Sequence, residues 1–175
     1  ALKEGFEENS HSETILKFIQ EVFKNTDFKK KDLEAIAVSK GPGSYTGLRI
    51  GVSTAKGLAY GLNLPLISAN TLYSLAFFGI EKQNEEKGMY IPMIDARRME
   101  VYCAVYNEKL KEIEPVEAKI IDEDSFNLHL EKGKVYFFGD GAMKLKGTIL
   151  HPNAVFIENC YTSSKYMGGL TFEKY

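Results

Sequence analysis

The stretch GPGSYTGLRIGVSTAKGLAYGL, at residues 41–62, is the least ordinary part of this 175-residue chain, and it decides the fold. A short apolar run at 34–39 precedes it and predicts a buried strand, and the small and apolar residues of 48–62 recur with helical spacing. A glycine-rich turn between a strand and a helix points backbone amides at the helix start, where anions are favoured. Gly43 and Ser44 therefore form either a turn that can bind phosphate or simply a tight turn.

The common phosphate-binding and catalytic motifs do not fit this stretch. A Walker loop needs Gly-x4-Gly-Lys-Ser/Thr, but three residues separate Gly43 from Gly47 and no lysine follows directly. The dinucleotide fingerprint Gly-x-Gly-x-x-Gly is one residue shorter than the run that begins at Gly41. Ser53-Thr-Ala-Lys56 matches Ser-x-x-Lys, but the Lys-Thr-Gly element that accompanies it in penicillin-interactive enzymes is absent. The histidines lack recognisable catalytic partners or metal-ligand spacing, so we predict no catalytic residue and no metal site.

The predicted helix carries two rows of residues with small side chains. The first row is Gly47, Gly51, Ala55 and Ala59, and the second is Ser53, Gly57 and Gly61. Each glycine inside a helix costs about 1 kcal/mol relative to alanine, so the close approach of another backbone is expected to offset that cost. The helix predicted before it, at 12–24, is apolar over a wide arc that includes Ile15, Ile19 and Val22. We expect these two helices to dock both on the chain's own sheet and on a second subunit.

The overall composition excludes several classes of protein. Lys and Arg number 22 against 24 Asp and Glu, which gives a net charge of −2 and argues against a strongly basic surface that grips nucleic acid. No apolar run reaches the roughly 20 residues of a membrane span. Cys103 and Cys160 are too few for a disulfide framework and indicate a reduced, cytoplasmic protein.

The order of elements predicts an α/β protein with two lobes, at 1–80 and 81–175, divided by the charged loop at 80–87. In the second lobe we predict strands at 90–94 and 100–106 that flank a turn, with Pro92 favouring a sheet edge or a strand end. Further elements are expected as a strand at 116–121, a polar helix at 122–132 and a strand at 135–138.

Five segments of the chain resemble TsaB (YeaZ), the bacterial family of tRNA threonylcarbamoyladenosine biosynthesis proteins. They are residues 41–72, Ser10-His-Ser-Glu13, the Met93–Tyr102 stretch MIDARRMEVY, Phe138–Ala142 and Ser163–Tyr166. The resemblance implies the actin-like ATPase superfamily fold of sugar kinases and heat-shock chaperones, with two RNase-H-like lobes. The first strand hairpin and the C-terminal tail of that family have no counterpart here, so we expect the natural protein to be longer.

The resemblance also implies a function. TsaB proteins are non-catalytic subunits that pair with the transferase TsaD and, together with the ATPase TsaE, support threonylcarbamoyl transfer onto the tRNA adenosine next to the anticodon. In that role the chain contacts tRNA only as part of the complex and binds no cofactor alone. ATP or ADP is expected at the interface with TsaD. Seven residues are expected at that interface: Ile15, Ile19, Val22, Gly47, Gly51, Ala55 and Ala59.

Some assignments stay open at this stage. Gly43, Ser44, Arg49, Arg97 and Arg98 contact nucleotide or tRNA, or they are ordinary turn and surface residues. A homodimeric binding protein and an enzyme in its own right, either an ATPase or a glycoprotease-like peptidase, are the alternatives to the accessory subunit.

Overall fold

The computed structural model of the chain describes residues 1–5, 11–172 and 174–175. They form two compact units, of which unit 1 joins residues 1–70 to 163–175 and unit 2 is residues 71–162. This division differs from the predicted one because the segment after residue 70 is a long helix, α3 (Thr71–Lys82), that packs on the sheet of unit 2. Ser10 and Glu13 have the spacing of a capping box, which predicts a helix start there, but they lie outside the residues and side chains that the structure describes.

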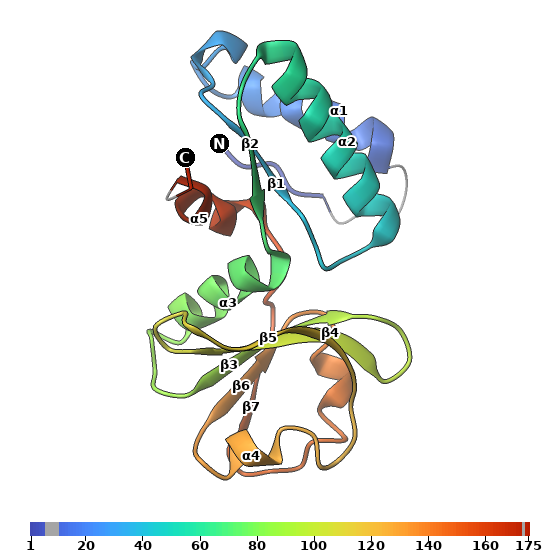
Figure 1. Cartoon of the computed structure of the whole chain (residues 1–175), viewed down its shortest axis with the longest axis vertical. Helices are drawn as coiled ribbons and strands as arrows, with labels where there is room; N and C mark the ends of the chain where they lie inside the picture. Colours follow the sequence, from blue (N-terminus) through green and yellow to red (C-terminus); the bar gives the residue numbers. More distant parts are fainter. Residues whose placement is uncertain (6–10, 173) are drawn as a thin grey trace. The chain divides into compact units, whose positions relative to one another are not determined.

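Unit 1 contains a pair of parallel strands joined by a helix. Parallel strands cannot be joined by a tight turn and need a crossover connection, which the helix supplies. Strands β1 (Ile36–Ser39) and β2 (Leu66–Ala69) pair in parallel, and α2 (Tyr45–Leu62) connects them. Helix α2 packs on β1, and α1 (His11–Lys24) packs on α2 (Figure 1). The predicted strand–turn–helix is therefore confirmed. The short elements are η1 (Lys30–Asp32), η3 (Ser164–Met167) and α5 (Gly168–Phe172), the last of which contacts β2.

Both ends of α2 are fixed by local chemistry. The Ser44 hydroxyl accepts a hydrogen bond from the Gly47 amide at 3.3 Å, which satisfies one of the free donors at the helix start. At the other end Asn63 adopts the left-handed conformation, with φ of 53°, and its amide bonds back to the carbonyls of Ala59 and Tyr60. The sequence thus sets the length of this helix without help from the rest of the fold.

Unit 2 is built on a five-stranded mixed sheet in the order β5-β4-β3-β6-β7 (Figure 1). The strands are β3 (Met89–Asp95), β4 (Glu100–Asn107), β5 (Glu112–Ile120), β6 (Val135–Phe138) and β7 (Ala154–Ile157). Antiparallel pairing joins β3, β4 and β5, so the predicted hairpin is confirmed, and β6 and β7 run parallel to β3. The helix expected at 122–132 is only α4 (Asn127–Leu130), and a short turn of helix, η2 (Met143–Leu145), follows β6.

The position of Pro92 corrects one expectation. Pro92 lies in the middle of β3, the central strand, and so at neither an edge of the sheet nor an end of the strand. The pairing of β3 with β4 holds at Tyr90 and resumes at Met93, so the missing amide of Pro92 falls where the ladder is interrupted.

Alternating residues of each strand divide the core of unit 2 into two layers. Phe137, with Ile91, Val101 and Leu130, belongs to the layer that includes α4 and η2. Tyr136 and Phe138 point the other way, into a layer that α3 covers with Leu72, Leu75 and Ala76. Helix α3 can lie close to the sheet because it carries Gly79 at the contact.

Gly79→Ala tests that close packing. A Cβ at Gly79 would lie 2.5 Å from Cζ of Phe138, whose ring is fully buried against Tyr90 and cannot move freely. We expect the substitution to lower the free energy of unfolding by about 1–2 kcal/mol, because overpacking outweighs the gain in helix propensity. Gly57→Ala is the matched control: its Cβ would meet nothing within 4 Å, so urea unfolding should show a gain of up to about 1 kcal/mol. Equal effects at both positions would contradict the packing described.

Candidate functional site

The first row of small residues on α2 faces the chain's own sheet. Ala55 and Ala59 are 6% and 7% exposed, and a Cβ added at Gly51 would lie 4.0 Å from a methyl group of Val38 on β1. These residues therefore serve packing inside unit 1, and little of Ala55 and Ala59 is left for a partner to touch. Gly47 is half-buried near the helix start, beside Ser44.

The opposite side of α2 is open to solvent and is called here the α2 outer face. Its exposed residues are Tyr45, Thr46, Arg49, Ser53, Lys56, Gly57, Tyr60 and Gly61. Tyr45 and Tyr60 are 74% and 92% exposed, and a Cβ at Gly57 or Gly61 would meet nothing within 4 Å. The accessible small row is thus the second one, Ser53, Gly57 and Gly61, which is not among the residues predicted for the interface.

A hollow of about 460 Å³ lies along the first half of this helix, lined by Tyr45, Thr46, Arg49, Ile50, Ser53 and Thr54. The guanidinium carbon of Arg49 lies 5.3 Å from the centre of the Tyr45 ring, which is a cation–π arrangement. Helix α1 packs beside α2 and leaves Ile15, Ile19 and Val22 half-buried and Leu16 52% exposed. The two helices therefore present aromatic, cationic and aliphatic groups next to a strip of small residues, which are Ser53, Gly57 and Gly61.

The turn before α2 is less open than its glycines suggest. The hydroxyl of Ser44 is engaged in capping the helix, and Gly41, with φ of 99°, takes a backbone conformation that only glycine adopts easily. Gly43 is half-buried behind it. A tight turn accounts for these residues, and their assignment to nucleotide or tRNA stays a prediction.

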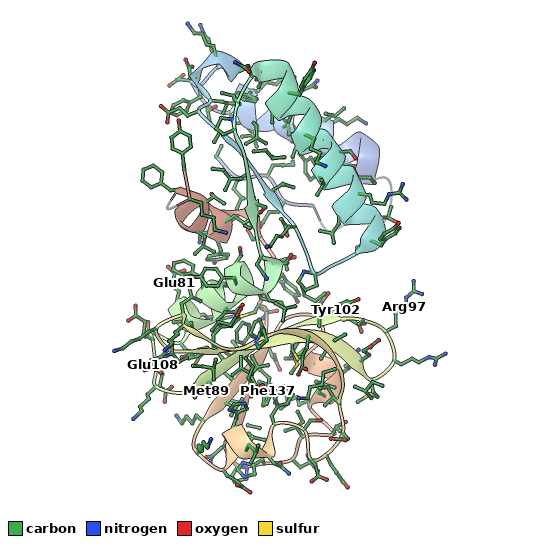
Figure 2. The ribbon with its side chains drawn as sticks, in the orientation of Figure 1. Glu81, Met89, Arg97, Tyr102, Glu108 and Phe137 are labelled. Atoms are coloured by element: carbon green, nitrogen blue, oxygen red, sulfur yellow. The ribbon has the colours of Figure 1, made fainter. Side chains whose placement is uncertain are left out.

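Arg97 and Arg98 belong to unit 2, where they lie in the turn between β3 and β4. Figure 2 shows Arg97 at the tip of this hairpin. The base of this hairpin is held by Asp95, whose carboxylate accepts hydrogen bonds from the Lys144 ammonium group and, at 2.8 Å, from the Arg97 amide. The hydrogen bond from Lys144 holds the pKa of Asp95 below its ordinary value. Lys144 also donates to the Glu100 carbonyl at 2.8 Å, so it joins the two sides of the hairpin.

Titratable groups elsewhere are engaged in structural contacts. Burial raises the pKa of the Cys103 thiol to about 12 and also raises that of Cys160, so neither is a ready nucleophile. His129 Nε2 lies 2.8 Å from a Glu114 carboxylate oxygen, and His151 Nδ1 accepts from the Asn153 amide at 3.1 Å. Among the residues described, no three His, Cys, Asp or Glu side chains gather as a metal site would require, and none of the helices could span a membrane.

Comparison with known proteins gives the chain its class. A family model described as "TsaD: tRNA N6-adenosine threonylcarbamoyltransferase" matches residues 7–154. The solved structure "YeaZ from Pseudomonas aeruginosa" superposes with a TM-score of 0.73 over 94% of this chain and 78% of its own, at 20% sequence identity. The fold is therefore that of the actin-like ATPase superfamily, with RNase-H-like lobes.

Sequence relatives narrow the class. The protein named tRNA threonylcarbamoyladenosine biosynthesis protein TsaB of Bacillus subtilis is 39% identical over 100 residues, which are 57% of this chain and 42% of the relative. The protein of the same name in Buchnera aphidicola of Schizaphis graminum is 32% identical over 157 residues, 82% of this chain and 74% of its own. The chain belongs to the TsaB (YeaZ) family. Its match spans about two fifths of the Bacillus protein.

Asp95→Asn tests the anchor of the hairpin through its pH dependence. Because the folded-state pKa of Asp95 is depressed from 3.8, its stabilising contribution is complete above pH 3.8 and is lost as the pH falls through the folded-state value. We expect the variant to unfold at a lower urea concentration than the unsubstituted chain near pH 7. The difference between their two unfolding midpoints should become smaller below pH 3.8. Asp27→Asn, in an exposed loop, controls for the removal of one negative charge. A gap that does not change with pH would show that the carboxylate charge plays no part.

Proposed function

We propose that the chain is an accessory, non-catalytic subunit in the formation of threonylcarbamoyladenosine in tRNA, and that it docks on a TsaD-type transferase through α1 and α2. The names of its relatives support the pathway. The observation that carries the docking proposal is the α2 outer face, where two highly exposed tyrosines lie with Arg49 and Lys56 beside the small residues Ser53, Gly57 and Gly61.

The chemistry of this face suits a protein partner. Tyrosine and arginine are the residues that most often contribute large shares of binding energy at interfaces. Tyr45, Arg49 and Tyr60 supply them, while Gly57 and Gly61 leave room for another backbone to come close. The helix keeps these glycines at a cost in propensity that its own unit does not offset at either position, since nothing in the described residues packs on them.

The remaining parts of the proposal concern the complex. TsaD carries out the transfer, TsaE acts with the pair, ATP or ADP binds at the interface, and tRNA is recognised by the assembly in the cytoplasm. The subunit activates by binding the active state of the transferase more tightly than the inactive one, and a tenfold activation needs only about 1.4 kcal/mol of such preference.

A homodimer is the second candidate, because the same exposed face on a second copy offers equivalent groups. It is distinguished by competition: self-association that a TsaD-type transferase cannot displace would favour the homodimeric binding protein. An enzyme in its own right would be favoured if the isolated full-length protein hydrolysed ATP or a peptide.

Tyr60→Ala and Gly57→Leu test the docking face. We expect the full-length protein and the transferase of its organism to form a 1:1 complex by light scattering, with tRNA modification depending on it. Tyr60→Ala should weaken the complex roughly 10–100-fold, as the loss of a central aromatic anchor does, and Gly57→Leu should abolish it by filling the strip.

The controls separate docking from folding. Tyr175→Ala removes an exposed tyrosine that lies off α1 and α2 and should leave the affinity unchanged. Gly57→Leu should unfold at the same urea concentration as the unsubstituted chain or higher. Gly51→Leu should be destabilised, because a Cβ there already contacts Val38 at 4.0 Å and the rest of a leucine side chain extends beyond it. Unchanged affinity in both Tyr60→Ala and Gly57→Leu would overturn the proposed face.

A further inference from the structure

The tip of the β3–β4 hairpin is built in an unfavourable backbone conformation. Arg97 and Arg98 have φ angles of 74° and 49°, so two consecutive residues with long side chains occupy the left-handed region. Hairpin turns of this kind ordinarily use glycine, asparagine or aspartate, for which the conformation is inexpensive. Strained residues of this type persist where the surroundings hold them and where the resulting geometry is used.

The surroundings of this turn do hold it. Asp95 binds the Arg97 amide, the Ala96 amide donates to the Glu100 carbonyl at 3.2 Å, and the Glu100 amide donates to the Arg97 carbonyl at 3.1 Å. Lys144 bonds to Asp95 on one side of the hairpin and to Glu100 on the other. The turn is thus fixed from outside the hairpin as well as within it.

The same contacts leave the two guanidinium groups without a hydrogen bond, although the positive charge of Arg97 attracts the Asp95 carboxylate. Both arginines are exposed, and neither guanidinium makes a hydrogen bond or ion pair with any residue that the structure describes. Arg97 extends from the hairpin tip away from the sheet (Figure 2). The nearby acids are occupied, since Asp95 pairs with Lys144 and an Asp140 oxygen accepts from the Asp95 amide at 3.1 Å.

We propose that Arg97 and Arg98 form a clamp for phosphate groups of an RNA backbone, a role that rests on the proposed function. Guanidinium groups bind phosphate oxygens through paired hydrogen bonds, and the fixed backbone of the turn holds two residues that carry them next to each other at the surface. An exposed hairpin tip fits an extended phosphodiester chain, and phosphate contacts of this kind position RNA without reading its bases. The clamp supplies a local grip although the chain as a whole carries a net charge of −2.

Replacement of both arginines by glycine tests the clamp through two opposite effects. In Arg97→Gly/Arg98→Gly the strain is relieved, so the equilibrium constant for unfolding should fall at least about fivefold. The affinity of the complex with the transferase for tRNA should fall roughly 10–100-fold, and its salt dependence should weaken by about one to two phosphate contacts. Arg97→Lys/Arg98→Lys should keep part of the affinity. A residue pair that matters only for folding would not produce this combination of a more stable chain and weaker RNA binding.

A control variant and separate measurements of tRNA and ATP affinity identify the ligand. Lys109→Ala/Lys111→Ala removes two exposed charges from the β4–β5 turn, at the other end of β4, and should leave tRNA affinity unchanged. A glycine variant that binds tRNA normally overturns the clamp, and one that loses only ATP affinity assigns it to a nucleotide and overturns the RNA assignment. Complex formation is measured separately by light scattering. If the unsubstituted chain forms no complex with the transferase, the proposed function fails, and tRNA is titrated against the chain alone. Weaker tRNA binding by the double glycine variant than by the unsubstituted chain would then still support the clamp.

Discussion

The close approach of the turn after β6 to the end of β3 is the constraint on which the functional geometry of unit 2 depends. A Cβ at Gly139 would lie 2.1 Å from the Met93 carbonyl oxygen, and the Gly141 amide donates to that same oxygen at 3.2 Å. Only glycine permits this contact, at a φ of 100° for Gly139. The contact brings Asp140 to the Asp95 amide, and Asp95 with Lys144 fixes the hairpin that carries the arginines.

Unit 1 applies the absence of side chains in a different way. On one side of α2, Gly51, Ala55 and Ala59 let the helix lie close to β1 and so stabilise the unit. On the other side, a Cβ at Gly57 would meet no atom within 4 Å. The lack of a side chain there leaves the strip of small residues accessible to solvent. One helix thereby packs on the sheet of its unit with one face and exposes the other face to solvent.

Much of the fold could be predicted because it follows from local signals. The helices around the glycine-rich turn and the hairpin of β3 and β4 are set by short-range periodicity and capping. The unit boundary could not be predicted, because α3 continues through its charged end to Lys82 and is assigned to unit 2 by packing on a sheet formed later in the chain. Strand β7 is short and only half-buried along most of its length, and it left no distinct pattern. Pro92 was misplaced because an interruption of the β3–β4 ladder accommodates it.

The sequence by itself determined the two rows of small residues on α2, the family to which the chain belongs, and the residues that form the hairpin turn. Helical periodicity determines which residues share a face, but it does not say which face turns inward. Only the tertiary structure decided that Val38 lies under Gly51 and that Tyr60 stays in solvent. The left-handed backbone of Arg97 and Arg98 was likewise decided there, because the contacts that support it come partly from Asp140 and Lys144, which are distant in the sequence.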